Sequence, residues 1–419
     1  MYSGFHIKKA CTASHRRSCN HIRPADYIIF AAVMLAVFEL TFNTLGRCLS
    51  DLLSELLQFL TLQLALFLSS FNINPAFYDL VINGICPGVG SVLSFIPVIA
   101  VLFFLLGLLQ ETGYLSKVSI LMDRPLKHAG LAGSCIIPLI MGFGCAVPAI
   151  MYTASMNTVP HRSLINTIRL IPFMSCSARL PVYSMLISCF FPEHRITVLL
   201  SIYAAGILTA AAAAFVLRIF PSAQPCSGRL AAAYTPEYHM PDMSRVISLV
   251  CENILGFVKK AFTVIFTASV LIWFLQSYSF DIQPVSSGDD SMLASMGLIC
   301  APIFAPLGFG SWKAAAAVIS GLFAKEAIIS TLVVTSSSSA ASAGIPPMMA
   351  LAEIFDPLSA FSFMIFCLLY MPCIATLSAV RSVTGSWRES IIMAVLHLLI
   401  AWSIAFIVYN VGTFIISLI

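Results

Sequence analysis

The sequence predicts an all-α fold: a polytopic helical membrane protein with inverted repeats, broken helices and two re-entrant hairpins. Of its 419 residues 59% are hydrophobic and only 10% are charged, and the mean hydropathy is +0.95. Soluble domains carry about 25% charged residues. Apolar runs of about 20 residues, the length that spans a bilayer as a helix, recur along the chain. Glycines and prolines interrupt several of these runs, which indicates helices that break inside the membrane.

Charge and cysteine content narrow the class further. The net charge of +4 is small and most basic residues lie between the apolar runs, so a nucleic acid partner is not expected. The 13 cysteines are scattered, and many lie inside apolar runs, unlike a secreted disulfide framework. Most are interpreted as small apolar packing residues, among them Cys48, Cys189, Cys251, Cys300 and Cys367.

Residues 1–25 are expected to form a basic cytosolic tail, and residues 26–419 the membrane permease domain. The tail contains five lysines and arginines and no acidic residue, and basic residues mark the cytosolic side of a membrane. A first span is predicted at Tyr27–Leu45. The next segment, Asp51–Phe71, is amphipathic at its start and is expected to lie in the membrane interface or to dip in and return.

The first of two repeats covers about residues 90–220. Its predicted parts are three crossings and one hairpin: Val92–Leu109, the hairpin Ala132–Met156, Leu164–Phe190 and Ile196–Phe220. The hairpin is inferred because Gly142–Pro148 breaks the apolar run. Basic residues flank the run on both sides, so both of its ends are expected in the cytosol.

The second repeat covers about residues 261–416. Its predicted parts are Ala261–Tyr278, the two arms of a hairpin that opens outward (Ser295–Gly310 and Ala314–Val334), Phe361–Ala379 and Ile391–Ile416. The whole chain then has roughly seven or eight crossings. The pattern Met-x-Cys-x-Ala-x-Leu supports the repeat, because it occurs at Met174–Leu180 and again at Met371–Leu377. Broken helices in corresponding halves point to the binding site of a transporter.

The stretch Pro172–Tyr183 carries the strongest chemical signal. Two prolines open the helix, and backbone carbonyls freed at membrane depth are tolerated only when they are buried in protein or line a watery cavity. Thiols near such breaks favour softer transition metals, and ferrous iron is a borderline case. The candidate metal ligands are Cys145, Cys176, Cys373, Met174, Met371, Ser175 and Ser177. The alternative is close helix packing by small residues.

Four charged residues are candidates for gating or ion pairing. Lys325 and Glu326 lie inside Ala314–Val334, where each charge costs about 2.5–3.5 kcal/mol at the centre of a membrane helix. One is expected to face a cavity and the other to pair elsewhere, with Arg179 as a candidate; the alternative is a structural ion pair that locks the hairpin. Arg179 is expected to act as a gate or counter-charge; the alternative is that its side chain extends to a surface. Glu111 is expected either to bind a cation in a vestibule or to cap a helix end.

No motif of a soluble enzyme is present. The chain has no G-x-x-x-x-G-K-[ST] loop, no G-x-S-x-G elbow and no H-E-x-x-H helix. An enzymatic activity and a permanently bound cofactor are therefore not expected. Energy for transport must come from an ion or substrate gradient, or from a partner protein.

Several motifs resemble the membrane permease part of the ferrous iron transporter B (FeoB) family. They are Gln110–Leu115, Met122–Arg124, Gly142–Cys145, Pro148–Ile150, Pro172–Tyr183, Gly321–Glu326, Leu369–Thr376 and Thr384–Trp387. The resemblance extends from about Tyr27 to the C-terminus. It implies import of Fe2+ across the bacterial inner membrane and two inverted gate repeats like those of nucleoside transporters. It also implies an iron path lined by Cys145, Cys176 and Cys373.

The chain departs from that family in three places. The family normally begins with a cytosolic GTP-binding domain, and this sequence has none, so a separate GTP-binding protein is an expected partner unless the permease works without GTP. Gln110 replaces one of two acidic residues, and Ala146 replaces an asparagine. The other predicted partners are a divalent metal, the lipid bilayer and a second copy of the chain. Two alternatives stay open: a nucleoside-type or other solute symporter, and a gate-domain membrane protein that transports nothing.

Overall fold

The computed structural model describes residues 24–70, 75–154, 156, 159, 161–219, 240–281, 283, 285, 290–323, 325, 327–341, 351–370 and 373–418. Helices make up almost all of this part, and it contains no β-strand. Together with the apolar composition, this confirms the all-α membrane fold that the sequence predicts. The predicted tail, residues 1–25, lies almost entirely outside the described residues.

The chain enters through one long helix rather than two separate segments. Helix α1 (Pro24–Glu39) continues through a π-helical turn, Leu40–Thr44, into α2 (Leu45–Ser70). Ala25–Ser70 thus forms an apolar helix of 46 residues. At about 1.5 Å per residue it is about 70 Å long, more than twice the hydrocarbon thickness of about 30 Å. The predicted span and the predicted interfacial segment thus belong to one continuous helix, and the part of it that crosses the membrane stays a prediction.

The π-helical turn explains how the long helix stays continuous. One extra residue is accommodated there, and the Thr41 hydroxyl donates to the Val37 carbonyl at 2.7 Å. The displaced Thr41 carbonyl leaves no room on the next turn: a Cβ at position 46 would lie 1.9 Å from it. Glycine at position 46 is therefore required by the turn, since any side chain would collide with the backbone.

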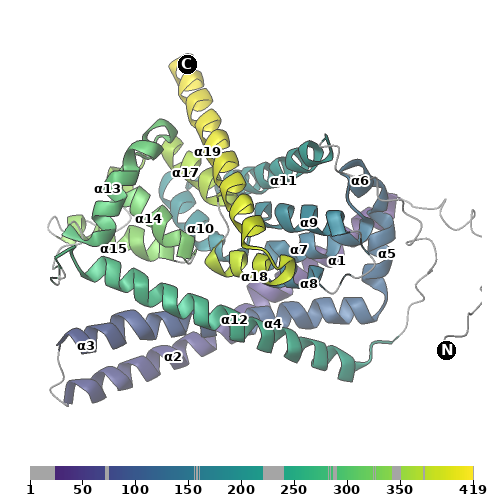
Figure 1. Cartoon of the computed structure of the whole chain (residues 1–419), viewed down its shortest axis with the longest axis horizontal. Helices are drawn as coiled ribbons and strands as arrows, with labels where there is room; N and C mark the ends of the chain where they lie inside the picture. The colour runs from purple at the N-terminus through teal and green to yellow at the C-terminus, as the bar shows by residue number, and fades with distance from the viewer. Residues whose placement is uncertain are drawn as a thin grey trace, which may run out of the picture.

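Three long helices form a layer along the lower edge of Figure 1. After α3 (Pro75–Asp79) the chain returns as α4 (Cys86–Glu111), which packs against both α2 and α12 (Met243–Ser277). Ser54 of α2 donates to the Ser94 hydroxyl of α4 at 2.9 Å. Such small polar contacts are a usual way to join helices in a membrane, where apolar surfaces gain little by meeting each other.

The helices from α4 onward form two series with the same order, so that α4 and α12 belong both to the layer and to a series. The first series is α4, α5 (Tyr114–Leu121), α6 (Asp123–His128), α7 (Ile136–Gly144), α8 (Ala146–Thr153), α9 (His161–Leu170), α10 (Leu180–Phe190) and α11 (Arg195–Ile219). The second is α12, α13 (Met292–Phe304), α14 (Trp312–Phe323), α15 (Ala327–Ala341), α17 (Pro357–Leu369), α18 (Ile374–Thr384) and α19 (Trp387–Leu418). Each series contains a sharp bend, a pair of short helices (α7 and α8, or α14 and α15) and a broken helix (α9 and α10, or α17 and α18). Each ends in a long helix, α11 or α19.

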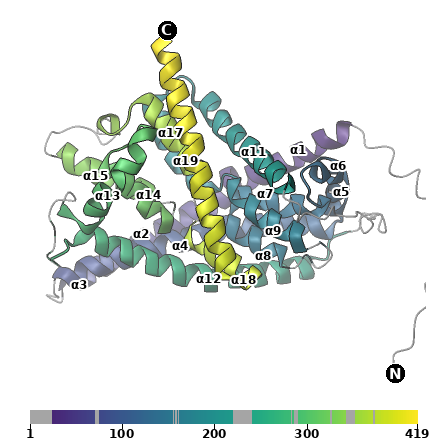
Figure 2. The ribbon, with the colours of Figure 1, turned by 45° about the horizontal axis from the view of Figure 1, so that its top comes forward.

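Contacts between the series follow the same correspondence. Helix α8 of the first series packs against α18 of the second, and the equivalent pair, α15 and α10, is also in contact. The chain bends by 80° between α4 and α5 and by 103° between α13 and α14. Figure 2 shows α19 crossing the body of the protein between the two groups of short helices. This order agrees with the repeated pattern seen in the sequence.

The second hairpin differs from its prediction. The run Ala314–Val334 was expected to be one arm, but the chain breaks after Phe323, and α14 and α15 pack against each other with Lys325 at the turn. The segment around the break contains good helix formers, so local propensity favours a continuous helix. The break therefore depends on tertiary packing rather than on local propensity.

Length and composition limit the number of crossings. In the described ranges four helices can cross a membrane by themselves, or six if each bent pair forms one span. This is fewer than the roughly seven or eight crossings predicted, because broken helices such as α9 and α10 are too short alone. The broken span that contains α17 is the most enclosed, with 75% of its apolar window buried. Its all-round apolar surface is that of a helix inside a bundle.

Candidate functional site

The first break lies where the prolines predict it. Helix α9 ends at Leu170, and Ile171–Phe173 forms a 3₁₀ turn that contains Pro172. Met174 is extended, with φ −70° and ψ 129°. A second turn, Ser177–Arg179, leads into α10, which has its proline in the first turn, where no hydrogen bond is lost. The segment thus crosses the protein as two half-helices joined by an irregular strip of backbone.

The second break separates α17 from α18. Tyr370 follows the end of α17 in an extended conformation, and its backbone N–H donates to the Phe366 carbonyl at 2.8 Å. Cys373 immediately precedes α18, and its Sγ lies 3.3 Å from the Thr376 hydroxyl. Met371, a predicted ligand, lies outside the described residues. Tyr370 and Cys373, the described residues on either side of this break, both have non-helical backbone.

Two of the three candidate cysteines lie on the two breaks: Cys176 between the two turns of the first break, and Cys373 immediately before α18 at the second. Arg179, three residues after Cys176, binds the Leu368 carbonyl at the end of α17 and so joins the two breaks. The two cysteines come from equivalent positions in the two series. We call Cys176, Cys373, Lys325, Arg179 and Tyr370 the central cluster.

Cys145 occupies the turn between α7 and α8. Its backbone is extended, and its N–H donates to the Met141 carbonyl at 3.0 Å. This turn packs on the first break, because a Cβ at Gly142 would lie 3.2 Å from both the Ile171 carbonyl oxygen and the Met174 Cβ. Cys145 therefore lies on the hairpin that touches the broken segment, beside rather than inside the central cluster.

Arg179 connects the two breaks. Its side chain is 3% exposed, so it does not snorkel to a surface. Nη1 donates to the Leu368 carbonyl at 2.5 Å and to the Pro172 carbonyl at 3.5 Å. A guanidinium is favourable there because the last carbonyls of a helix carry partial negative charge. The partner of Arg179 is thus backbone of α17; the predicted pairing through Glu326 falls outside the described residues.

Lys325 is also buried, with 3% of its surface exposed. Its Nζ lies 3.2 Å from the centroid of the Tyr370 ring, a close cation–π contact. Tyr370 itself is fully buried. Arg179 therefore contacts the backbone of the second break, and Lys325 contacts its aromatic ring, that of Tyr370.

The remaining predicted residues lie at different distances from the cluster. Ser175 is buried, and its hydroxyl lies beside those of Tyr183 and Tyr203. Met174 is half-buried on the same extended strip. The side chain of Ser177 is outside the described part. Glu111 ends α4 just before Gly113, whose φ of 78° makes the bend, so its position fits a residue at a helix end.

Sequence reasoning missed one member of the cluster, Tyr370, and two buried residues of the same broken segments, Tyr183 and Cys367. All three are almost completely buried. Tyr370 directly precedes the second Met-x-Cys pattern, and Tyr183 ends the first proline-bounded stretch, so position could have indicated both. Cys367 carries no such signal, because it lies inside an apolar helix like any packing cysteine.

The donor set is sparse for a metal site. Over the described ranges no group of three or more histidine, cysteine, aspartate or glutamate side chains could hold a metal ion. The two breaks offer two thiols, hydroxyl groups and freed backbone carbonyls as metal ligands. Such a mixed set suits loose and transient binding better than a permanent structural metal, for which four protein ligands are usual.

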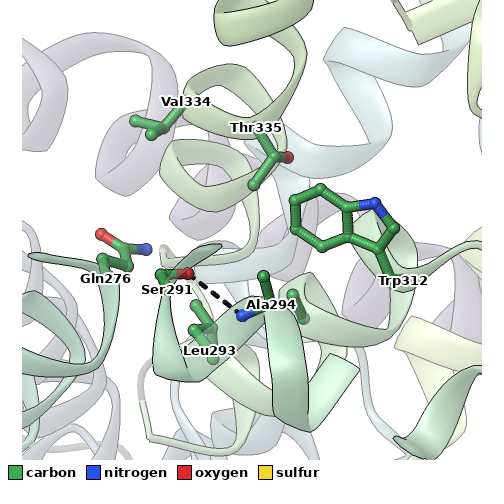
Figure 3. A pocket seen from close by; sticks show the side chains of 8 residues that line it. Gln276, Ser291, Leu293, Ala294, Trp312, Val334 and Thr335 are labelled. Carbon is green, nitrogen blue, oxygen red and sulfur yellow. Dashed lines mark hydrogen bonds between the residues drawn. The ribbon is translucent and has the colours of Figure 1, made fainter. Parts of the chain in front are cut away.

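A small pocket lies elsewhere, between α12, α13, α14 and α15 (Figure 3). Its lining consists of Gln276, Ser291, Leu293, Ala294, Trp312, Ala316, Val334 and Thr335. Two polar groups around it form hydrogen bonds within the protein. Gln276 donates to the Thr331 hydroxyl at 3.1 Å, and the Ser291 hydroxyl caps α13 by accepting from Ala294 N–H. None of the predicted site residues lines this pocket.

Comparison with protein families and with individual proteins gives a consistent picture. Residues 92–190 and 258–387 match the Gate family, described as nucleoside recognition. The Fe(2+) transporter FeoB of Staphylococcus aureus (strain MSSA476) is 38% identical over 92% of this chain and 57% of its own length. The Fe(2+) transporter FeoB of Methanocaldococcus jannaschii is 33% identical over 80% of this chain and 50% of its own length.

A further relative is a fusion protein. The Fe(2+) transport protein A/Fe(2+) transporter FeoB fusion protein of Porphyromonas gingivalis is 30% identical over 93% of this chain and 50% of its own length. The chain thus spans about half the length of the curated relatives it matches. No solved structure matches it at a significant level. The matched segments cover both breaks and most helices of both series, and the chain therefore belongs to the Gate family and is a homologue of the FeoB transporters.

Proposed function

We propose that this protein is a ferrous iron permease that moves Fe2+ inward across the bacterial inner membrane. The names of its relatives support the substrate, and the apolar helices support the membrane location. The single observation that carries the proposal is that Arg179 joins the two half-helix breaks, one carrying Cys176 and the other Cys373, through its hydrogen bond to the Leu368 carbonyl. Thiols from two halves of a membrane protein suit a borderline metal such as Fe2+.

In the proposed mechanism the two series move against each other around the breaks. Transporters with inverted repeats keep the binding site at the repeat interface and open it to each side in turn. Cys176 and Cys373 would hold the ion at the centre, with Met174, Met371, Ser175 and Ser177 as weaker ligands. Cys145, on the hairpin packed against the first break, would take the ion next on the cytosolic side. Weak, exchangeable ligands are needed because a conducted ion must also leave.

Energy is proposed to come from a GTP-binding protein part that acts with the permease. The matched relatives are about twice as long as the matched region, and one of them is named as a fusion with Fe(2+) transport protein A. These relatives support the idea that the permease works with further protein parts. An uptake assay with and without GTP and a candidate GTP-binding protein distinguishes this energy source from an ion gradient.

The test of the iron path is uptake by purified protein in liposomes without oxygen. Cys176→Ser and Cys373→Ser are each expected to lower Fe2+ uptake about tenfold or more, since even indirect metal contacts cost about 10–100-fold in affinity. Cys48→Ser is the matched control, because Cys48 is exposed on α2 and should leave uptake unchanged. Each variant must elute as the wild type does on size exclusion. Normal Fe2+ uptake by both cluster variants would disprove the role of the thiols.

A second candidate is a nucleoside-type or other organic-solute symporter. The description of the Gate family as nucleoside recognition favours it. It predicts uptake that depends on Na+ or H+ and that does not respond to cysteine replacement. The same liposomes, supplied with nucleosides instead of iron, separate the two candidates, and a gate-domain protein without transport activity would move neither.

A further inference from the structure

His397 lies where α19 meets the first break. It is fully buried, and its Nε2 lies 3.0 Å from the carbonyl oxygen of Arg169, the residue before the last one of α9. A carbonyl oxygen can only accept a hydrogen bond, so Nε2 carries a proton and donates it. The last four carbonyls of an α-helix have no partner within the helix. His397 therefore supplies a donor to a backbone group at the end of α9.

The same ring packs on the turn that follows α9. Its centroid lies 4.2 Å from that of Phe173, the last residue of the 3₁₀ turn, and Phe173 is 1% exposed. The backbone there is also closely packed, because a Cβ at Gly206 of α11 would lie 3.0 Å from the Phe173 carbonyl oxygen. Met174 follows directly, and Cys176 comes two residues later. The position of Phe173 therefore determines where the candidate metal ligands lie.

Helix α19 is itself attached to both halves of the second broken helix. Ser362 of α17 donates to the Ala405 carbonyl of α19 at 3.3 Å. Ser390 of α19 donates to the Leu377 carbonyl of α18 at 3.2 Å. His397 lies between these two attachment points along α19. The second series thus holds the backbone of the first break through this side chain.

We infer that His397 is a positioning residue of the iron path: its N–H and its ring hold the first break in the conformation that presents Met174 and Cys176 to the ion. It acts through Arg169 and Phe173 rather than by contact with the ion. The inference rests on the proposed function, because the placement of these two sulfur ligands matters only if they bind a metal. Removing groups that orient metal ligands commonly costs about 10–100-fold in affinity or activity.

Three substitutions separate the hydrogen bond from the packing. His397→Phe keeps a flat ring over Phe173 but cannot donate, and His397→Leu removes both features. His397→Gln keeps an N–H donor on a side chain of similar reach. In liposomes without oxygen, His397→Phe and His397→Leu are expected to raise the KM of Fe2+ uptake about tenfold, with a smaller change in the maximal rate. His397→Gln is expected to return the KM to near the wild-type value.

The matched control is Trp402→Phe on the same helix. The Trp402 indole N–H donates to the Ile303 carbonyl of α13 at 3.0 Å, so this variant also removes one hydrogen bond between α19 and backbone. The phenylalanine ring can still stack on Phe406, whose centroid lies 5.2 Å from that of Trp402. Trp402→Phe should leave the KM of Fe2+ uptake unchanged, whatever it costs in stability.

A second measurement needs no iron. Hydrogen exchange of the purified, metal-free full chain, resolved by peptide, reports how often residues 171–176 open. His397→Phe and His397→Leu are expected to speed exchange in this segment about tenfold, because a backbone group at the end of α9 loses its donor. His397→Gln and Trp402→Phe should exchange there as the wild type does.

The possible results separate the inference from the proposed function. A wild-type KM in a folded His397→Phe or His397→Leu variant overturns the positioning role, and each variant decides this alone if the other misfolds. A KM raised equally in His397→Gln or in Trp402→Phe also overturns it, because the effect then does not depend on this donor. Absence of Fe2+ uptake by the wild type overturns the proposed function. Unchanged exchange in both donor-free variants overturns the hold of His397 on the break, whatever the protein transports.

Discussion

At the scale of single residues, Gly321 sets the position of the Tyr370 ring. A side chain at this position would meet the Tyr370 hydroxyl oxygen at 2.2 Å and Ile328 Cγ1 at 2.5 Å. Tyr370 is fully buried and cannot shift toward solvent. Because the ring in turn carries Lys325, the size of one small residue on α14 determines whether the central cluster can form.

Gly321→Ala is therefore expected to lower the free energy of unfolding by about 1–3 kcal/mol, the usual cost of overpacking a filled interior. The matched control is Gly90→Ala on α4, where an added Cβ meets no atom within 4 Å. There alanine should be neutral or stabilising, since it exceeds glycine in helix propensity by about 1 kcal/mol. Thermal unfolding in detergent measures both, and equal midpoints for the two variants would contradict the packing described.

At the scale of elements, α19 fixes the end of α9 just before the first break. Arg169 Nη2 donates to Glu389 Oε2 at 2.8 Å, and His397 Nε2 lies 3.0 Å from the Arg169 carbonyl oxygen. The His397 ring also stacks on Phe173, with 4.2 Å between centroids. The first break is thus held in place by the last helix of the second series.

The ion pair between Arg169 and Glu389 is expected to contribute a coupling energy of about 1 kcal/mol in a double-mutant cycle. Its side chains are 26% and 30% exposed, so water screens them only partly. The comparison pair is Arg47 and Asp51 on α2, 3.7 Å apart and 68% and 67% exposed, which should show a coupling near zero. Unfolding in mixed micelles with Arg→Gln and Glu→Gln or Asp→Asn variants gives both couplings. A value near zero for Arg169 and Glu389 would show that α19 is joined to α9 by packing alone.

At the scale of the whole molecule, the two series interlock at their breaks. Arg179 of the first series binds backbone of α17, and α8 and α10 each pack on a helix of the other series. The layer of α2, α4 and α12 lies against one side of this arrangement. A movement that changes one break must therefore change the contacts of the other, which is what alternating access between two repeats requires.

The orientation of the molecule in the membrane is also testable. Basic residues before and at the start of α12 predict that this end lies in the cytosol, and the acidic segment after α12 is expected outside. A fluorescent protein fused after Asp242 should be bright, and alkaline phosphatase fused after Asp290 should be active. A phosphatase fused after Leu418 should be active too, because α19 is predicted to cross outward. Asp242 and Asp290 on the same side would mean that α12 does not span the membrane.

Local sequence features by themselves predict the membrane helices, two of the breaks and the repeat. Low charge and long apolar runs predict membrane helices, since each charge in a bilayer is costly and each backbone group must be bonded internally. Pro172, Pro181 and Gly142–Pro148 predict two of the breaks, because proline removes a backbone donor wherever it stands. The repeated Met-x-Cys-x-Ala-x-Leu pattern predicts that the stretches around Cys176 and Cys373 are equivalent.

Only the tertiary structure decided how these pieces meet. The break at Lys325 has no local signal, because the residues around it favour a helix, and it exists where the ammonium reaches the Tyr370 ring. The binding of Arg179 to the Leu368 carbonyl of α17 joins residues 189 positions apart. Such contacts depend on how the two series pack, and no periodicity or spacing within either series contains that information.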